Sequence, residues 1–227
     1  NQLSEEILQH LVKTLILELN IHKKKGILIG ETSSQRYNDF CEKLYQKEFL
    51  RQLIDEYPVL FRLISDKIEG AKNLLQTIIF SFENDKKILQ KNKLISCKFE
   101  GKINEITINM GDTHNGGYSV SIIELDNFEK IVFKPRDLEI DIKFNNLLHW
   151  LNNSSEIDIH FKTISIVNNK SYGWTEFIEY KPLISKKEIA DFYNSLGGIL
   201  ALLYILNATD FHYENIICLL YTSPSPR

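Results

Sequence analysis

The stretch TDFHYEN, residues 209–215, lies near the C-terminal end, directly after a long run of apolar residues at helical spacing. Its Asp210 and Asn215 are separated by four residues. A carboxylate can meet a hydroxyl that attacks a phosphate, and an amide oxygen can hold Mg²⁺, so this spacing is compatible with a phosphoryl-transfer loop. The alternative is a capped helix end, in which the two side chains only bind backbone amides. The stretch alone favours that alternative.

A glycine-rich segment upstream, GDTHNGG at residues 111–117, lies between two strand-like runs. Because glycine has no Cβ, such a turn can bring backbone N–H groups close to phosphate oxygens. Gly116 and Gly117 are therefore candidates for a nucleotide-phosphate site. The segment matches neither the dinucleotide nor the Walker pattern, and an ordinary hairpin with a satisfied Asp–His pair also explains it.

A lysine, Lys134, ends the strand after this turn and is followed by Pro135 and Arg136. Protein kinases place the lysine that binds nucleotide phosphates at the end of such a strand, and the next helix supplies its acidic partner. Lys134 and Arg136 are the candidates for phosphate contacts here. Glu139 and Asp141 are both candidates for the partner, because ordinary first-turn acids of a helix would look the same.

The period of the apolar residues predicts an α+β fold. It is helical across residues 1–20 and 34–91, with Pro58 where one helix ends and another begins. Further helices are expected at 137–151 and after Ser185, which can form a capping box with Glu188. Alternating runs predict strands at 106–110, 118–125, 129–134, 157–167 and 172–179, the last two separated by Asn168-Asn169.

The two later helices carry apolar stripes that are expected to be buried, and Trp174 is expected to belong to the core. The stripe of the first helix is Ile140, Phe144, Leu147, Leu148 and Leu151. The stripe of the second is Ile189, Phe192, Leu196, Ile199, Leu200, Leu203 and Leu206.

The composition excludes several classes of protein. The 227 residues are 43% hydrophobic, enough for one large domain or two small ones. The 27 basic and 30 acidic residues are spread evenly, so no nucleic-acid footprint is expected. The three cysteines lie far apart without a CxxC pair, which is typical of a reducing cytoplasm and not of a zinc site. No apolar run is long enough to span a membrane, and residues 1–20 alternate charged with apolar positions, which is not the pattern of a signal peptide.

Four segments together carry a family resemblance. They are GDTHNGGYSV at 111–120, FKPRDLEID at 133–141, YGWTEFIEYKP at 172–182 and LLYILNATDFHYENII at 202–217. In this order they closely resemble the dehydratase domain of class II lanthipeptide synthetases, the LanM-type lantibiotic biosynthesis enzymes. The resemblance implies a two-lobed fold similar to lipid kinases. It also implies that ATP and Mg²⁺ are used to phosphorylate Ser and Thr of a ribosomally made precursor peptide, and that the phosphate is then eliminated to leave dehydroamino acids.

The resemblance also implies roles for individual residues. Lys134 would contact the ATP phosphates, while Asp112 and His114 would line the same cleft. The phosphoryl-transfer loop would consist of Asp210, His212 and Asn215, with Asn215 as the metal ligand. His212 would either orient the peptide hydroxyl or shuttle a proton, and the sequence leaves both roles open.

Further expectations concern the partners and location of the protein. The partner is a precursor peptide with its leader, and association with an export complex is expected as well. Zinc belongs, in this family, to a separate cyclase domain. The location is expected to be cytoplasmic, with no nucleic-acid partner.

The chain departs from the family pattern in three places. Tyr118 stands where the resemblance implies an arginine, and no acidic residue follows Glu214, where a second metal carboxylate is expected. Residues 219–227 resemble a cloning remnant, since two prolines cannot continue a central strand. We therefore expect a C-terminally truncated piece of a longer enzyme, inactive by itself.

The expected organisation has four parts: a helical region at 1–92, a sheet-bearing lobe at 93–180, the start of a helical lobe at 181–218 and a non-native tail at 219–227. Two other functions stay open. One is a kinase-like phosphotransferase without elimination activity. The other is a leader-peptide-binding module whose nucleotide site is vestigial.

Overall fold

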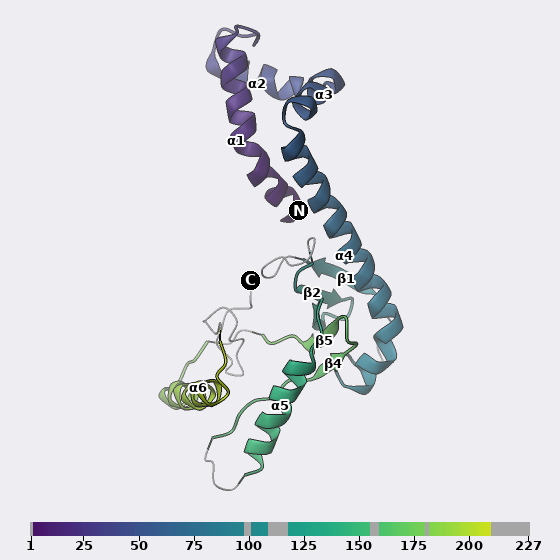
Figure 1. Ribbon diagram of the computed structural model, residues 1–227, viewed down its shortest axis with the longest axis vertical. Coiled ribbons are helices and arrows are strands. Elements are labelled where there is room, and N and C mark those ends of the chain that lie inside the picture. The colour runs from purple at the N-terminus through teal and green to yellow at the C-terminus, as the bar shows by residue number, and fades with distance from the viewer. Residues whose placement is uncertain (1, 98–100, 109–117, 155–158, 180–181, 210–227) are drawn as a thin grey trace. The chain divides into compact units, whose positions relative to one another are not determined.

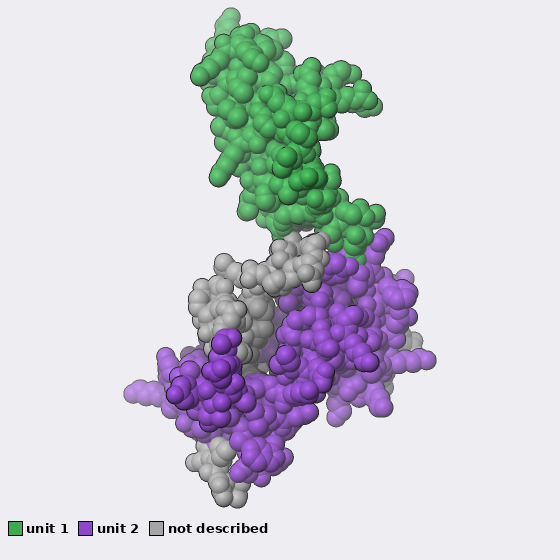
Figure 2. Space-filling model, viewed as in Figure 1, with its two compact units in different colours: residues 1–73 green, residues 74–227 purple. Residues whose placement is uncertain are grey.

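The computed structural model describes residues 2–97, 101–108, 118–154, 159–179 and 182–209. Within these residues it contains six helices and a five-stranded antiparallel sheet, in agreement with the expected α+β class (Figure 1). The chain separates into two compact units, residues 1–73 and residues 74–227 (Figure 2). Across the described ranges, none of the helices combines the length and the apolar character needed to cross a membrane.

The first unit is helical. It contains α1 (Gln2–Lys24), α2 (Ser33–Lys43) and α3 (Lys47–Glu56). Its apolar core consists of Leu28, Phe40, Phe49 and Leu53. The next helix, α4 (Pro58–Lys91), begins at the predicted proline, and its residues from Leu74 onward belong to the second unit.

A buried carboxylate lies in this helical unit. Glu18 of α1 has only 2% of its surface exposed. The Tyr57 hydroxyl donates a hydrogen bond to its Oε1 at 2.5 Å, and Nδ1 of His22 lies 3.5 Å from its Oε2. Because a buried charge is costly without partners, the Tyr57 hydroxyl stabilises the fold by satisfying it.

Removing the Tyr57 hydroxyl is expected to destabilise the protein in a pH-dependent way. The hydrogen bond to Glu18 and burial raise the pKa of Tyr57 from 10.0 to about 12. A group with a raised folded-state pKa stabilises the fold fully below its unfolded pKa and loses this contribution as the pH rises through the folded pKa. Tyr57→Phe should therefore lower the free energy of unfolding by about 1–3 kcal/mol near neutral pH. The difference from the wild type should shrink between pH 10 and about 12.

Urea denaturation at a series of pH values measures this difference. Tyr45→Phe is the matched control, because Tyr45 is 88% exposed and its substitution should change little at any pH. A Tyr57→Phe deficit that stays constant across the alkaline range would contradict the assigned role of the hydroxyl.

The second unit is built on the sheet. Its strands are β1 (Ile103–Thr107), β2 (Ser121–Leu125), β3 (Lys130–Lys134), β4 (Ile166–Asn168) and β5 (Gly173–Glu176). Their order is β1-β2-β3-β5-β4, and all neighbouring pairs are antiparallel. β3 is the central strand, with Phe133 opposite Ser121 of β2 and Trp174 of β5. Lys134, the last residue of β3, therefore belongs to a strand that pairs with a neighbour on both sides.

Trp174 joins the sheet to the second half of α4. Its side chain is fully buried, as predicted, and its ring makes edge contacts with Phe82 of α4 at 6.2 Å and with Phe133 at 4.9 Å. Its indole N–H also donates a hydrogen bond to Oδ2 of Asp85 at 2.9 Å. A ring contact with Phe82 and a hydrogen bond with Asp85 thus both hold Trp174 against α4.

The predicted strand over residues 157–167 is wrong for residues 159–165, which follow α5 (Glu139–Asn152) without forming a strand. Two asparagines of α5 take the place of a neighbouring strand. Asn152 bonds both the N–H and the carbonyl of Phe161, at 2.7 and 2.6 Å, and Asn145 does the same for Ile164, at 3.1 and 3.0 Å. Because side-chain amides satisfy these backbone groups, no sheet ladder is needed.

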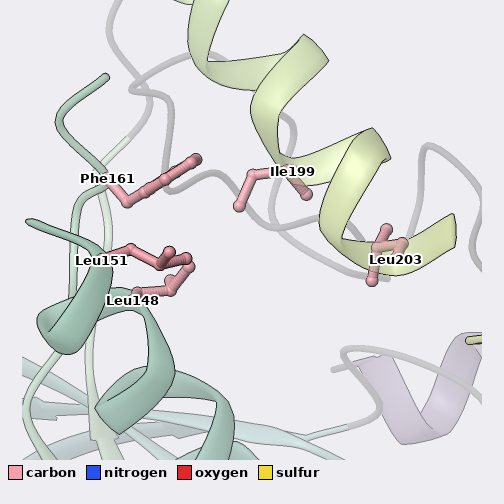
Figure 3. Close-up of a cluster of buried hydrophobic side chains, with 5 residues drawn as sticks. All are labelled: Leu148, Leu151, Phe161, Ile199 and Leu203. Carbon is pink, nitrogen blue, oxygen red and sulfur yellow. The ribbon is translucent and has the colours of Figure 1, made fainter. Parts of the chain in front are cut away.

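The last helix, α6 (Lys186–Ile205), begins with the predicted capping box of Ser185 and Glu188. It packs through Ile199 and Leu203 against a cluster that includes Leu148 and Leu151 of α5 and Phe161 (Figure 3). The predicted stripes are too long. Ile140 is 80% exposed and Leu200 is 67% exposed, because this cluster begins at Phe144 on α5 and uses a narrow face of α6.

Candidate functional site

Lys134 is enclosed at the end of β3. Alternation along the strand buries Ile131 and Phe133 on one face of the sheet and directs Val132 and Lys134 to the other. Only 14% of the Lys134 side chain is exposed. Burial lowers the pKa of this lysine, the charge of Asp141 opposes that effect, and the charge of Arg136 adds to it. The strand thus presents a poorly hydrated cation.

Asp141, in the first turn of α5, is the acidic partner of Lys134. Its Oδ1 lies 3.5 Å from the Lys134 ammonium nitrogen. Glu139 instead pairs with Lys143, with a separation of 2.8 Å between Oε1 and Nζ. The structure therefore resolves the choice that the sequence leaves open.

Arg136 binds the same carboxylate more closely than Lys134 does. Its Nη1 lies 2.7 Å from Oδ2 of Asp141 and its Nη2 lies 3.0 Å from Oδ1, which is a bidentate pair. Arg136 is 56% exposed, whereas Asp141 is only 19% exposed. One carboxylate thus pairs with two cations, so the cluster of Lys134, Arg136 and Asp141 carries a net positive charge, which the nearby Asp137 carboxylate reduces through its interaction with Arg136. Such a cluster is suited to bind an anion, because both cationic groups are phosphate ligands in proteins.

The other candidate residues lie outside the described residues. They are Asp112, His114, Gly116, Gly117, Asp210, His212 and Asn215. Their roles stay predictions. In the part of the chain that the structure describes, no three His, Cys, Asp or Glu side chains form a group that could hold a metal ion.

Asn168 contacts the connection next to this site, although the sequence indicated only a turn between two strands. Its side chain bonds the backbone of Leu138 and the carboxylate of Asp137, in the connection between β3 and α5. These partners lie 30 and 31 residues earlier in the chain. No local pattern could have revealed the contact, because it depends on the antiparallel order of β3, β5 and β4.

Comparison with known proteins gives two findings. A family model described as "Domain of unknown function (DUF4135)" matches residues 57–219. The chain is also homologous to the "Lacticin 481/lactococcin biosynthesis protein LcnDR2" of Lactococcus lactis subsp. lactis, with 29% identity over 226 residues and 96% of this chain. The chain spans 24% of the length of that relative. This homology confirms the resemblance that the four sequence segments carry.

Proposed function

This chain belongs to the family described as a domain of unknown function (DUF4135), and from this membership and its homology to a lantibiotic biosynthesis protein we propose that it takes part in modifying a lanthipeptide precursor peptide. More specifically, we propose that the modification is the ATP-dependent dehydration of Ser and Thr side chains in that precursor peptide. The reaction has two stages. A phosphoryl group is transferred to the hydroxyl oxygen, and then loss of a Cα proton and cleavage of the Cβ–O bond release phosphate and leave an alkene.

The observation that carries this proposal is the shared carboxylate of Asp141. It holds Lys134 and Arg136 together in a cluster with excess positive charge, at the end of the central strand. This arrangement fits a polyphosphate, because phosphoryl transfer depends on charge neutralisation and positioning more than on covalent chemistry by the protein.

In the proposed site, Lys134 and Arg136 bind the phosphates and hold the nucleotide in position. Asp210 accepts the proton of the peptide hydroxyl, and His212 orients that hydroxyl or moves a proton during elimination. Asn215 would hold Mg²⁺. ATP supplies the phosphoryl group, and the metal ion offsets the charge of the triphosphate. The two-lobed, lipid-kinase-like arrangement of the whole protein is part of the same proposal.

Mass spectrometry of the precursor peptide tests the proposed reaction. The protein, as its gene encodes it, is incubated with ATP, Mg²⁺ and a Ser/Thr/Cys-rich peptide encoded beside it. We expect the peptide to lose one water for each modified residue, and only when ATP is present. Asp210→Asn should abolish both phosphorylation and water loss.

The other outcomes separate the competing functions. Stable phosphopeptide without loss of water would indicate a phosphotransferase that lacks elimination activity. An unmodified peptide that still binds the protein through its leader would indicate a binding module and would overturn the proposal.

A further inference from the structure

The connection between β3 and α5 is held by a residue from another hairpin. Asn168, the last residue of β4, accepts a hydrogen bond at Oδ1 from the Leu138 N–H at 3.0 Å. Its Nδ2 donates to Oδ1 of Asp137 at 2.8 Å, and that oxygen also accepts the Glu139 N–H at 2.8 Å. One amide side chain therefore fixes two consecutive residues directly before α5.

These bonds satisfy backbone N–H groups at the start of α5, which has no side-chain cap. Leu138 occupies the N-cap position, and its apolar side chain cannot accept the backbone N–H groups that a helix start leaves free. Asn168 and Asp137 instead accept the N–H groups of Leu138 and Glu139, two of the four that the helix start leaves free. Since Asp141 lies in the first turn of α5, the bonds that fix the start of the helix also fix the carboxylate that holds Lys134 and Arg136.

Packing supports the same connection. In the sheet, Gly173 lies opposite both Asn168 of β4 and Lys134 of β3. A Cβ on Gly173 would lie 2.4 Å from Cδ1 of Leu138, which is fully buried. Leu138 thus fills the space that the missing side chain leaves. The hairpin that carries Asn168, the end of β3 and the start of α5 form one tightly packed junction.

We propose that Asn168 is a positioning residue for the phosphate site, which it serves by holding the start of α5 so that Asp141 keeps Lys134 and Arg136 in place. This inference rests on the proposed function, namely that these two cations bind ATP. Asn168 itself touches neither cation. Its effect on the nucleotide passes through Asp137, Leu138 and the first turn of α5.

The test exchanges the two side chains of the Asn168–Asp137 pair in the protein as its gene encodes it. Asn168→Asp keeps an acceptor for the Leu138 N–H but replaces the donor to Asp137 with a second carboxylate. We expect ATP to bind about tenfold more weakly, by calorimetric titration with MgATP. Adding Asp137→Asn restores a donor and removes the repulsion, so the double variant should recover most of the affinity. Asn169→Asp is the matched control, because this exposed neighbour bonds Tyr172 and not the β3–α5 connection.

The outcomes distinguish this inference from the proposed function. If the wild-type protein binds no ATP, both fail. If it binds ATP and Asn168→Asp binds equally well, or if Asp137→Asn restores nothing, only the inference about Asn168 is overturned. If Asn168→Asp lowers the unfolding temperature without changing the ATP affinity, Asn168 has only a structural role and the inference is overturned. Should Asn168→Asp not fold, Asn168→Ser removes both bonds without adding charge and should weaken ATP binding in the same way.

Discussion

Lys134→Ala is expected to lower kcat/KM for ATP by about 10²- to 10³-fold in precursor dehydration, the usual effect of removing one group that stabilises charge in a transition state. The substitution removes the enclosed cation at the end of the central strand. Arg136 keeps both of its bonds to Asp141, so no unpaired carboxylate is left behind. Stability should therefore change by less than about 1 kcal/mol. Steady-state kinetics and urea denaturation on the same preparations measure both quantities.

The matched control is Lys130→Ala on the same strand. Lys130 is 42% exposed and pairs with Glu124 at 3.1 Å, away from Asp141. Its removal should leave the kinetics within about twofold of the wild type, since exposed ion pairs contribute little. If Lys134→Ala leaves ATP affinity and turnover unchanged, Lys134 does not belong to a nucleotide site.

Trp174→Ala is expected to have the largest effect on stability, a loss of about 3–5 kcal/mol in the free energy of unfolding. The change leaves a cavity between Phe82 and Phe133 and removes the indole donor from Asp85. Because whole domains are stable by only about 5–15 kcal/mol, this loss would come close to unfolding the second unit. Urea denaturation followed by far-ultraviolet circular dichroism measures it without relying on tryptophan fluorescence.

Two further variants separate the contributions at this position. Trp174→Phe retains much of the apolar volume but leaves Asp85 without the N–H, and should cost about 1–3 kcal/mol. Trp150→Ala is the control, because Trp150 is 67% exposed on α5 and should change stability by less than about 0.5 kcal/mol. Equal losses for Trp150→Ala and Trp174→Ala would contradict the burial described for Trp174.

Much of the fold could be predicted from the sequence, because local patterns determine it. The order of helices and strands follows the apolar period, and the capping box at Ser185 reflects a contact between residues three positions apart. The burial of Trp174 was predictable from its place in a strand. The elements and the cap depend on interactions within one segment, whereas Phe82 and Phe133, which contact the buried Trp174, belong to other segments.

The rest depended on contacts between segments. Glu139 and Asp141 are both first-turn acids, and the sequence could not show which of them faces β3. Residues 159–165 alternate like a strand, yet Asn145 and Asn152 of a helix satisfy the backbone there. Ile140 continues the apolar stripe of α5 but lies beyond the reach of the cluster that buries the stripe. Contacts with other segments of the chain decided all three outcomes: the partner of Lys134, the absence of a strand at 159–165 and the exposure of Ile140.

The contact between α4 and β5 limits where this protein can be cut into smaller pieces. On the second half of α4, the side chains of Leu74, Ile78 and Phe82 are fully buried. Asp85 on the same helix accepts a hydrogen bond from Trp174, which lies 89 residues later in the chain. A piece cut to begin at β1 would lose the Phe82 contact and the indole acceptor together. It would present the rings of Trp174 and Phe133 to water, which favours self-association. An excised sheet unit intended for crystallisation or binding studies should therefore begin no later than Leu74.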